Sequence, residues 1–208
     1  MICSIDFETR SAVDLRKTGV YVYATDVSTD VWCMAYSWDG EDVRVWSPGD
    51  PMDSELEDWI VEGGKLQAWN ANFERVIWNK IMAPRYNWPR TRAGQWYCTM
   101  AQASAAGLPR ALGQAAAVLG VEEQKDKVGQ ALMLRMARPR KTLADGTHTW
   151  WTTPDKVEAL IRYCVQDVRS RDCCCLRVHR FASLIIDWTR QRPLRSCRQR
   201  HNPLAALN

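Results

Sequence analysis

The amino-acid sequence predicts an α/β domain built on a mixed β-sheet. Strand-type runs and helical patterns alternate over roughly the first hundred residues, and helical patterns dominate after them, an order typical of an α/β domain. A hairpin signal, Asp39-Gly40, lies between two of the strand-type runs and makes that strand pair antiparallel. The chain has 208 residues, 46% hydrophobic and 25% charged, a balance typical of one globular domain.

The strand signals come in order along the chain. Residues 2–7 form a short apolar run that contains the acidic Asp6, as expected of a central strand that ends at a site. The hairpin joins two runs rich in β-type residues, 31–38 and 42–47, the second of which alternates in polarity. Two shorter candidates follow at 66–69 and 95–98.

The helical signals lie between and after these strands. Asp53 is a capping residue for a helix over 54–62, which Gly63-Gly64 ends. Apolar spacing predicts a helix over 72–82 that stops before Pro84. The remaining helices are expected at 99–106, 110–119, 127–137 and from Asp155 to about 170.

Targeting and cysteine signals favour a cytosolic protein. The N-terminus carries a charge at its sixth residue and lacks the apolar core of a signal peptide, and no run of eighteen apolar residues exists to span a membrane. The eight cysteines contain no CxxC pair, so a zinc ribbon is not expected. We expect reduced cysteines, most of them in the core.

Charge divides the chain unevenly. Residues 169–208 contain nine Arg, no Lys and two acids, whereas the whole chain has a net charge of +4. The shift predicts a folded domain over 1–170 and an Arg- and Cys-rich tail over 171–208. A nucleic-acid-binding arm and a solvated terminus explain this tail equally well.

Two carboxylates stand close together at the end of the first strand. Asp6 and Glu8 are two residues apart, so their side chains point to the same face. Neighbouring anions repel each other unless a cation lies between them, and Mg²⁺ or Mn²⁺ prefers such oxygen ligands. Surface strands also carry such pairs by chance, and taken alone this pair favours the chance explanation.

Two further segments carry carboxylates in suggestive places. Asn70 and Glu74 stand where a strand passes into a helix, the end at which α/β proteins place their sites. Taken by itself, that segment is explained better by ordinary helix capping than by a functional site. Tyr163 and Asp167 lie four residues apart on one helix face. An ordinary Tyr–Asp pair on a half-buried helix surface is common and explains this segment as well.

Together the three motifs resemble those of the DEDD-type 3′→5′ exonucleases. These are Asp-x-Glu, Asn-x-x-Phe-Glu and Tyr-x-x-x-Asp in that order, and the third is typical of the tyrosine subclass. Residues 108–133, 137–150 and 163–168 also look like the proofreading region of phage-type family A DNA polymerases. The family usually has Asp in the second motif; Glu74 is one methylene longer and can still reach a metal. The resemblance covers about 1–168.

The resemblance implies a ribonuclease-H-like fold, with a mixed five-stranded sheet flanked by helices. It implies an exodeoxyribonuclease that releases nucleoside 5′-monophosphates from single-stranded 3′ ends of DNA with two divalent ions, Mg²⁺ or Mn²⁺. The metal ligands would be Asp6, Glu8, Glu74 and Asp167, and Tyr163 would orient the attacking water. The cytosol of a bacterium or a phage-infected host is the implied location, with a polymerase domain on a longer or separate chain as partner and no membrane association.

Substrate strands require basic and stacking side chains near such a site. The candidates for contacting nucleic acid are Phe7, Thr9, Arg10, Asn70, Phe73, Lys125, Lys127, Arg140 and Lys141. Core packing is the stronger interpretation of Phe73 and of Trp78, because aromatic residues at helical spacing are most often buried. A solvated turn explains Arg140 and Lys141 without any function.

Three alternatives remain open at this point. An inactive relic would keep the fold and bind nucleic acid without turnover. A related nuclease would act on RNA, since the 2′-OH is read by local geometry. The tail after residue 170 can also be interpreted as the remnant of a truncated or frameshifted polymerase. It stands where such polymerases continue into their polymerase domain, and no catalytic motif of a polymerase is found in the sequence.

Overall fold

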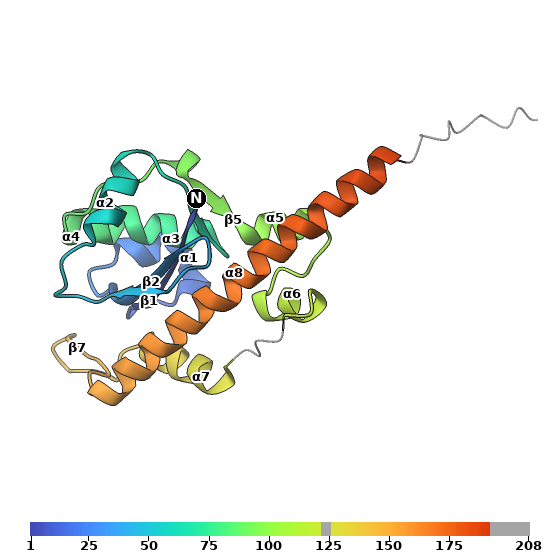
Figure 1. Ribbon diagram of the computed structural model, residues 1–208. Helices are drawn as coiled ribbons and strands as arrows, with labels where there is room; N and C mark the ends of the chain where they lie inside the picture. Colours follow the sequence, from blue (N-terminus) through green and yellow to red (C-terminus); the bar gives the residue numbers. More distant parts are fainter. Residues whose placement is uncertain (122–125, 192–208) are drawn as a thin grey trace, which may run out of the picture.

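A five-stranded mixed sheet forms the centre of the protein, whose computed structural model describes residues 1–121 and 126–191 (Figure 1). The strand order is β3-β2-β1-β4-β5, with β1–β2 and β2–β3 antiparallel and β1–β4 and β4–β5 parallel. The strands are β1 (Cys3–Arg10), β2 (Asp30–Trp38), β3 (Arg44–Trp46), β4 (Leu66–Ala68) and β5 (Trp96–Cys98). The prediction of an α/β fold with a mixed five-stranded sheet flanked by helices is confirmed, and this strand order and pairing fit a ribonuclease-H-like fold.

Helices lie on both faces of this sheet. They are α1 (Leu15–Thr25), α2 (Ser54–Val61), α3 (Ala71–Ile77), α4 (Ala83–Arg85), α5 (Thr99–Ala105), α6 (Leu112–Val118), α7 (Lys127–Met136) and α8 (Pro154–Gln191). A π-helical turn at Trp78–Met82 joins α3 to α4, and a 3-10 turn at Ala93–Gln95 precedes β5. A small second sheet pairs β6 (Lys141–Thr142) with β7 (His148–Thr149). None of the described helices is long and apolar enough to span a membrane.

Alternation along β1 and β2 gives the sheet two different faces. Ile5, Phe7 and Met34 belong to the large core that α3 and the π turn complete with residues such as Trp78. On the opposite face, Cys33 and Ala35 of β2 pack against Cys164 and Val168 of α8. Since side chains two apart share a face, Asp6 and Glu8 lie on the α8 side.

The β2–β3 hairpin has the turn that its sequence predicts. Asp39 and Gly40 both have left-handed backbone angles, with φ of 46° and 84°, and the Glu41 N–H donates to the Trp38 carbonyl over 2.8 Å. Two positive φ values in succession characterise the tight hairpin turn that Asp-Gly favours. The Asp39 side chain also accepts from the Ile2 N–H, which connects the turn to the start of β1.

One helical run differs from its predicted end. A single helix was expected over 72–82, stopping before Pro84, but helical backbone continues from Ala71 to Arg85 through the π turn. Proline cannot donate to the usual i to i−4 ladder. The π turn interrupts that ladder just before Pro84, so the chain continues as the short α4.

Helix α8 crosses the domain boundary expected at residue 170. It runs without a break from Pro154 to Gln191, and Figure 1 shows it lying across the whole molecule. Arg171 and Asp172 are buried, as is Val178. Asp172 accepts from Ser4 of β1 and, over 2.5 Å, from Ser37 of β2. Packing therefore extends to at least Val178, while the part of the expected tail over 192–208 lies outside the described residues.

We expect truncation after Ser170 to unfold the protein or lower its stability severely. The cut removes the buried Val178 and the partner of Ser4 and Ser37, and unsatisfied buried polar groups are costly. Thermal unfolding of the shortened chain measures this effect. The control is a chain ending after Gln191, which keeps all of α8, and equal stability of the two would contradict the packing assigned to residues 171–178.

Candidate metal centre

A single cavity of about 390 Å³ brings together the carboxylates of three distant segments. Asp6 and Glu8 reach it from β1, Glu74 from α3 and Asp167 from α8. Asp6, Glu8 and Glu74 are nearly buried, at 8%, 7% and 5% exposure. The structure therefore places all four predicted metal ligands around one space.

Sheet topology explains this convergence. β1 and β4 run parallel, with Cys3 beside Leu66 and Ser4 beside Gln67, so β1 continues past the end of β4. The chain then turns at Asn70 into α3, which sets Glu74 in the first turn of that helix, close to the free end of β1. Polar groups at the carboxyl ends of adjacent parallel strands meet at one edge of a sheet. α8 closes the same edge from the β2 side with Asp167.

The protein raises the pKa of two of these carboxyls above its ordinary value. Burial raises the pKa of Glu74 to about 8, with Asp6 adding to the shift and Arg171 opposing it. Burial and the neighbouring Asp6 also raise the pKa of Glu8 well above its ordinary value. In addition, the Glu74 Oε2 atom is buried without a hydrogen-bond partner. Crowded carboxylates with an unsatisfied buried oxygen fit a bound divalent cation.

A cysteine shares this space but does not change the preferred metal. The Sγ atom of Cys164 lies 3.6 Å from Asp6 Oδ2, and ligand atoms of Asp6, Glu8 and Cys164 lie within 4.8 Å of one another. Burial, followed by a hydrogen bond with Cys33, raises the pKa of this thiol well above its ordinary value. A neutral thiol is a poor ligand, so the groups here that could hold a cation are the carboxylates, whose oxygens would suit Mg²⁺ or Mn²⁺.

A buried arginine also reaches the site. Arg171 of α8 is 2% exposed, and its guanidinium donates to Asp6 Oδ1 and to the Ile5 carbonyl. Burial alone would lower the pKa of Arg171, but the carboxylates of Asp6, Glu74 and Asp167 raise it above its ordinary value. The sequence prediction missed this residue because its charge was counted with the tail. The i, i+4 spacing from Asp167 was the available signal.

Tyr163 is buried next to the cavity and is not among the residues that line it. It is 4% exposed, and its phenol hydrogen-bonds Asp167. Burial, with Asp167 and Glu8 next in size, raises its pKa. A Cβ atom added to Gly129 of α7 would lie 2.5 Å from the Tyr163 ring. Gly129, which sequence reasoning did not single out, therefore allows α7 to approach Tyr163 closely.

The apolar and polar candidates for substrate contact lie largely at the cavity. Phe7, Thr9, Asn70 and Phe73 all line it. The Thr9 hydroxyl is bonded to Tyr23 Oη over 2.8 Å, and Phe7 packs edge-on against Trp78. Asn70 is exposed and makes no capping hydrogen bond, so capping does not explain its side chain. Phe73 is half-buried, which leaves part of its ring accessible.

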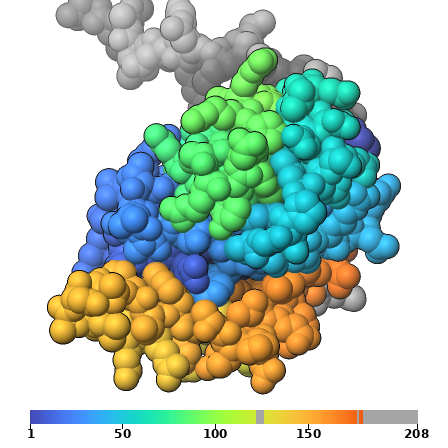
Figure 2. Space-filling model, turned by 90° about the vertical axis from the view of Figure 1, so that its left-hand side faces the viewer, coloured from blue at the N-terminus to red at the C-terminus, as the bar shows by residue number. Residues whose placement is uncertain are grey.

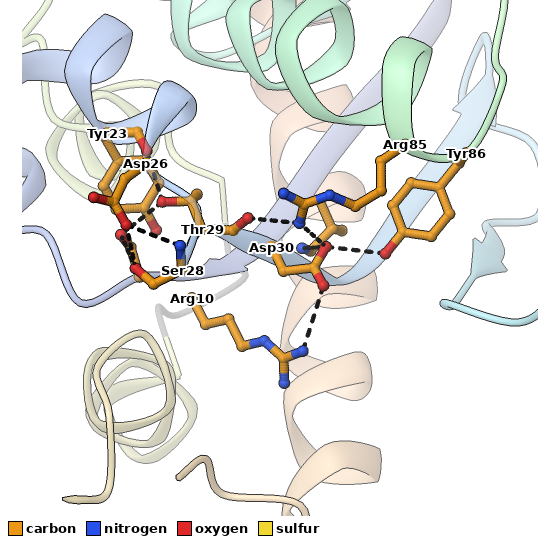
Figure 3. A network of polar contacts seen from close by, with 10 residues as sticks. Arg10, Tyr23, Asp26, Ser28, Thr29, Asp30, Arg85 and Tyr86 are labelled. Atoms are coloured by element: carbon orange, nitrogen blue, oxygen red, sulfur yellow. Dashed lines mark hydrogen bonds and ion pairs between the residues drawn. The ribbon is translucent and has the colours of Figure 1, made fainter. Parts of the chain in front are cut away.

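Arg10, in contrast, is engaged within the protein. Its guanidinium pairs with Asp30 over 3.4 Å and lies over the Trp32 and Trp150 rings, at 4.4 and 5.1 Å from their centroids. Asp30 also accepts from Tyr86 and pairs with Arg85 (Figure 3). This network connects β1 to β2 and to the segment before α8. The predicted contact of Arg10 with nucleic acid remains a prediction.

The other basic candidates lie outside the cavity lining. Lys127 is exposed at the start of α7, and Arg140 and Lys141 are exposed at the β6–β7 hairpin. Lys125 lies outside the described residues. Arg138, which lines the cavity, connects this basic segment to the site.

A basic-aromatic cluster surrounds Trp151. Arg135, Arg140 and Lys156 place their charges 5.8, 5.2 and 4.4 Å from its ring centroids. These residues belong to α7, the approach to β6 and the start of α8. In Figure 2 the β6–β7 region and the start of α8, coloured amber to orange, form one continuous side of the face. Positive charge beside aromatic rings suits single-stranded nucleic acid.

The raised pKa of Glu74 has a consequence for metal-free stability. A carboxyl with a folded-state pKa near 8 and an ordinary value of 4.5 favours folding at low pH, and this contribution is lost as pH rises from 4.5 to 8. Glu74→Gln stays neutral, so we expect a smaller fall in unfolding temperature between pH 5 and pH 9 than in the unaltered chain. The pKa of Glu8 is also raised, so the stability of the Glu74→Gln variant should still depend on pH to some extent.

Thermal unfolding in the presence of a chelator tests this expectation. Glu57→Gln makes the same chemical change at an exposed position of α2 and should leave the pH dependence unaltered. Identical pH profiles for the Glu74 variant and the unaltered chain would show that Glu74 is ionised in the metal-free fold.

Comparisons with known proteins find similarity both by sequence and by structure. The chain is 35% identical over 188 residues to the "DNA polymerase" of Bacillus phage SP02, which covers 87% of this chain and 28% of that protein. The chain thus spans less than a third of the length of this relative. A solved structure described as "apo form of the nuclease" aligns with a TM-score of 0.47 and 13% identity, over 94% of this chain and 89% of the other. No protein-family model matches the chain.

Proposed function

We propose that this chain is a metal-dependent 3′→5′ exonuclease that removes nucleoside 5′-monophosphates from DNA, as the proofreading part of a phage-type DNA polymerase. The observation that carries the proposal is the set of four carboxylates, from β1, α3 and α8, around one cavity. The likeness to a phage DNA polymerase over 87% of the chain supports the setting in DNA replication. Mg²⁺ and Mn²⁺ are the proposed ions, since all four side chains offer hard oxygen ligands.

The residues of the chain have distinct parts in this proposal. Asp6, Glu8, Glu74 and Asp167 would hold divalent ions, which supply charge stabilisation to the phosphodiester during hydrolysis. Tyr163 holds the Asp167 carboxylate through its phenol and would fix the orientation of the attacking water. A pair of ions, which the resemblance implies, would have to share the Asp6 carboxylate with Arg171.

The cavity walls suggest how a 3′ end would be received. Phe73 and Phe7 offer apolar surface, and Asn70 offers an amide, all around the carboxylates. The basic-aromatic cluster at Trp151 would hold the approaching strand through its phosphates and bases. A terminal nucleotide would then lie against the carboxylates while the strand continues along α7 and the hairpin.

The test is cleavage of DNA labelled at either end. With Mn²⁺ or Mg²⁺, a 5′-labelled single strand should shorten in steps of one nucleotide, and a 3′-labelled strand should release labelled mononucleotide first. Chelation should stop both reactions. Internal cleavage products or release from the 5′ end would contradict the proposed polarity. Repeating the assay with an RNA strand of the same sequence shows which of the two substrates is preferred.

An inactive nucleic-acid-binding protein is the second candidate, because Arg171 already pairs with the Asp6 carboxylate. A buried cation neutralises part of the cluster without any metal, as a relic of the fold would permit. This candidate predicts that DNA binds equally well with and without divalent ions and is never shortened. Stepwise shortening in the cleavage assay rules it out.

The basic-aromatic cluster predicts a specific loss of DNA affinity. Arg140→Gln should weaken binding of single-stranded DNA and reduce the salt slope of log affinity by about 1, as expected for one lost phosphate contact. Binding measured over a salt series gives both quantities. Arg90→Gln, at an exposed position in the segment between α4 and β5, is the matched control. An unchanged slope in the Arg140 variant would remove this residue from the interface.

A further inference from the structure

Arg171 places a buried positive charge against Asp6, one of the proposed metal ligands, and the following inference rests on the proposed function of that site. The guanidinium donates to Asp6 Oδ1 with one nitrogen and to the Ile5 carbonyl with another. It is 2% exposed, and Glu74 and Asp167 also act on its charge. Two anchored contacts and almost complete burial hold the group in place.

The arginine divides the two oxygens of Asp6 between different neighbours. Oδ1 accepts from Arg171, whereas Oδ2 lies 3.6 Å from Cys164 Sγ. Ligand atoms of Asp6, Glu8 and Cys164 gather within 4.8 Å of one another. Oδ2, which accepts from the Cys164 thiol, is therefore the Asp6 oxygen that Arg171 leaves uncovered.

The charge balance leads to the same conclusion. The four carboxylates carry four negative charges when ionised, and Arg171 cancels one of them. An arginine side chain does not lose its proton in proteins. A divalent ion bridging Asp6 through Oδ1 would meet the guanidinium directly, and like charges at contact distance repel strongly in a buried site.

We infer that Arg171 takes the place of one cation, so that the site binds a single divalent ion, between Asp6 Oδ2 and Glu8. The arginine is a positioning residue: it fixes Asp6 from one side and neutralises the charge that a second ion would otherwise balance. Removing its charge without removing its bulk opens a second position next to Asp6 and Glu74.

The experiment is a titration of the full chain with Mn²⁺ near neutral pH. Binding is measured by calorimetry and by the electron paramagnetic resonance signal of free Mn²⁺. The unaltered chain should bind one Mn²⁺. Arg171→Met, which keeps an unbranched apolar side chain, should bind two, with the first about tenfold tighter or more because a nearby positive charge is gone. Arg169→Met makes the same change at an exposed position of α8 and should still bind one.

Each result decides the inference. Two Mn²⁺ in the unaltered chain would overturn it while leaving the proposed nuclease standing, and one Mn²⁺ in a folded Arg171→Met chain would overturn it as well. No Mn²⁺ in any variant would overturn both the inference and the proposed function. If circular dichroism shows that the Arg171→Met chain does not fold, the number of Mn²⁺ ions bound by the unaltered chain still tests the inference.

Discussion

Asp6→Asn is expected to lower DNA cleavage about 10³-fold or more while leaving a folded protein. Asp6 is the carboxylate around which the site is arranged: it contacts Arg171 and shares its open side with Glu8. An amide binds Mg²⁺ or Mn²⁺ far less well than a carboxylate, and bound metal supplies several kcal/mol of transition-state stabilisation. Asparagine keeps the shape and can still accept from Arg171. Single-turnover cleavage of a labelled oligonucleotide measures the loss.

Asp58→Asn, at an exposed position of α2, makes the same change away from the cavity and should cleave at the original rate. A fully active Asp6→Asn variant would remove Asp6 from the chemistry. Circular dichroism of both variants separates loss of activity from loss of fold.

Asp6→Ala is expected to lower the stability of the metal-free chain, although repulsion between Asp6 and Glu8 alone would suggest the opposite. Repulsion between Asp6 and Glu8 predicts that losing one carboxylate slightly stabilises the metal-free chain. Arg171 reverses this expectation, because the alanine variant leaves a buried guanidinium without its ion-pair partner. Breaking a buried pair in this way costs about 3–5 kcal/mol. A metal-free alanine variant as stable as the unaltered chain would show that the ion pair contributes nothing.

Tyr163→Phe is expected to lower turnover about 10²-fold with little change in the Michaelis constant. The phenol is the only polar group lost, and it holds Asp167. Positioning of this kind acts mainly in the transition state, and proton-transfer and orientation effects contribute about 10²–10⁴ in rate. The phenyl ring still fills the space against Gly129, so the fold should persist.

Tyr97→Phe, on the exposed side of β5, is the matched control and should leave both constants unchanged. A Tyr163→Phe variant that changes only the Michaelis constant would make Tyr163 a substrate-binding or packing residue. Mn²⁺ affinity should stay within a few-fold in this variant, since all four carboxylates remain.

Local signals account for the parts of the fold that sequence predicted well. The Asp39-Gly40 turn, the Asp53 cap and the apolar run of β1 each depend on neighbours in the chain, and each is present as expected. α1 went unpredicted because it is kinked at Gly19 (φ 76°) and exposes Tyr21 and Val22. Such a helix lacks a clear apolar stripe. The β6–β7 hairpin, with two residues in each strand, is too short to show alternation.

The site depended on contacts that no local pattern displays. The three carboxylate motifs were found through their order along the chain, and their roles stay predictions until tested. Arg171 was missed because its partner Asp6 is 165 positions away, and the composition of the C-terminal part hid it among other arginines. Asp172 was missed for the same reason, since Ser4 and Ser37 give no sign in sequence of a buried partner on α8.

Diffraction from crystals grown with Mn²⁺, recorded at a wavelength where manganese scatters anomalously, tests the metal centre most directly. The central claim is that Asp6, Glu8, Glu74 and Asp167 surround a divalent cation. The account predicts an anomalous peak inside the cavity, in contact with the carboxylates of Asp6 and Glu8. An empty cavity at saturating Mn²⁺, with Arg171 still on Asp6, would contradict it.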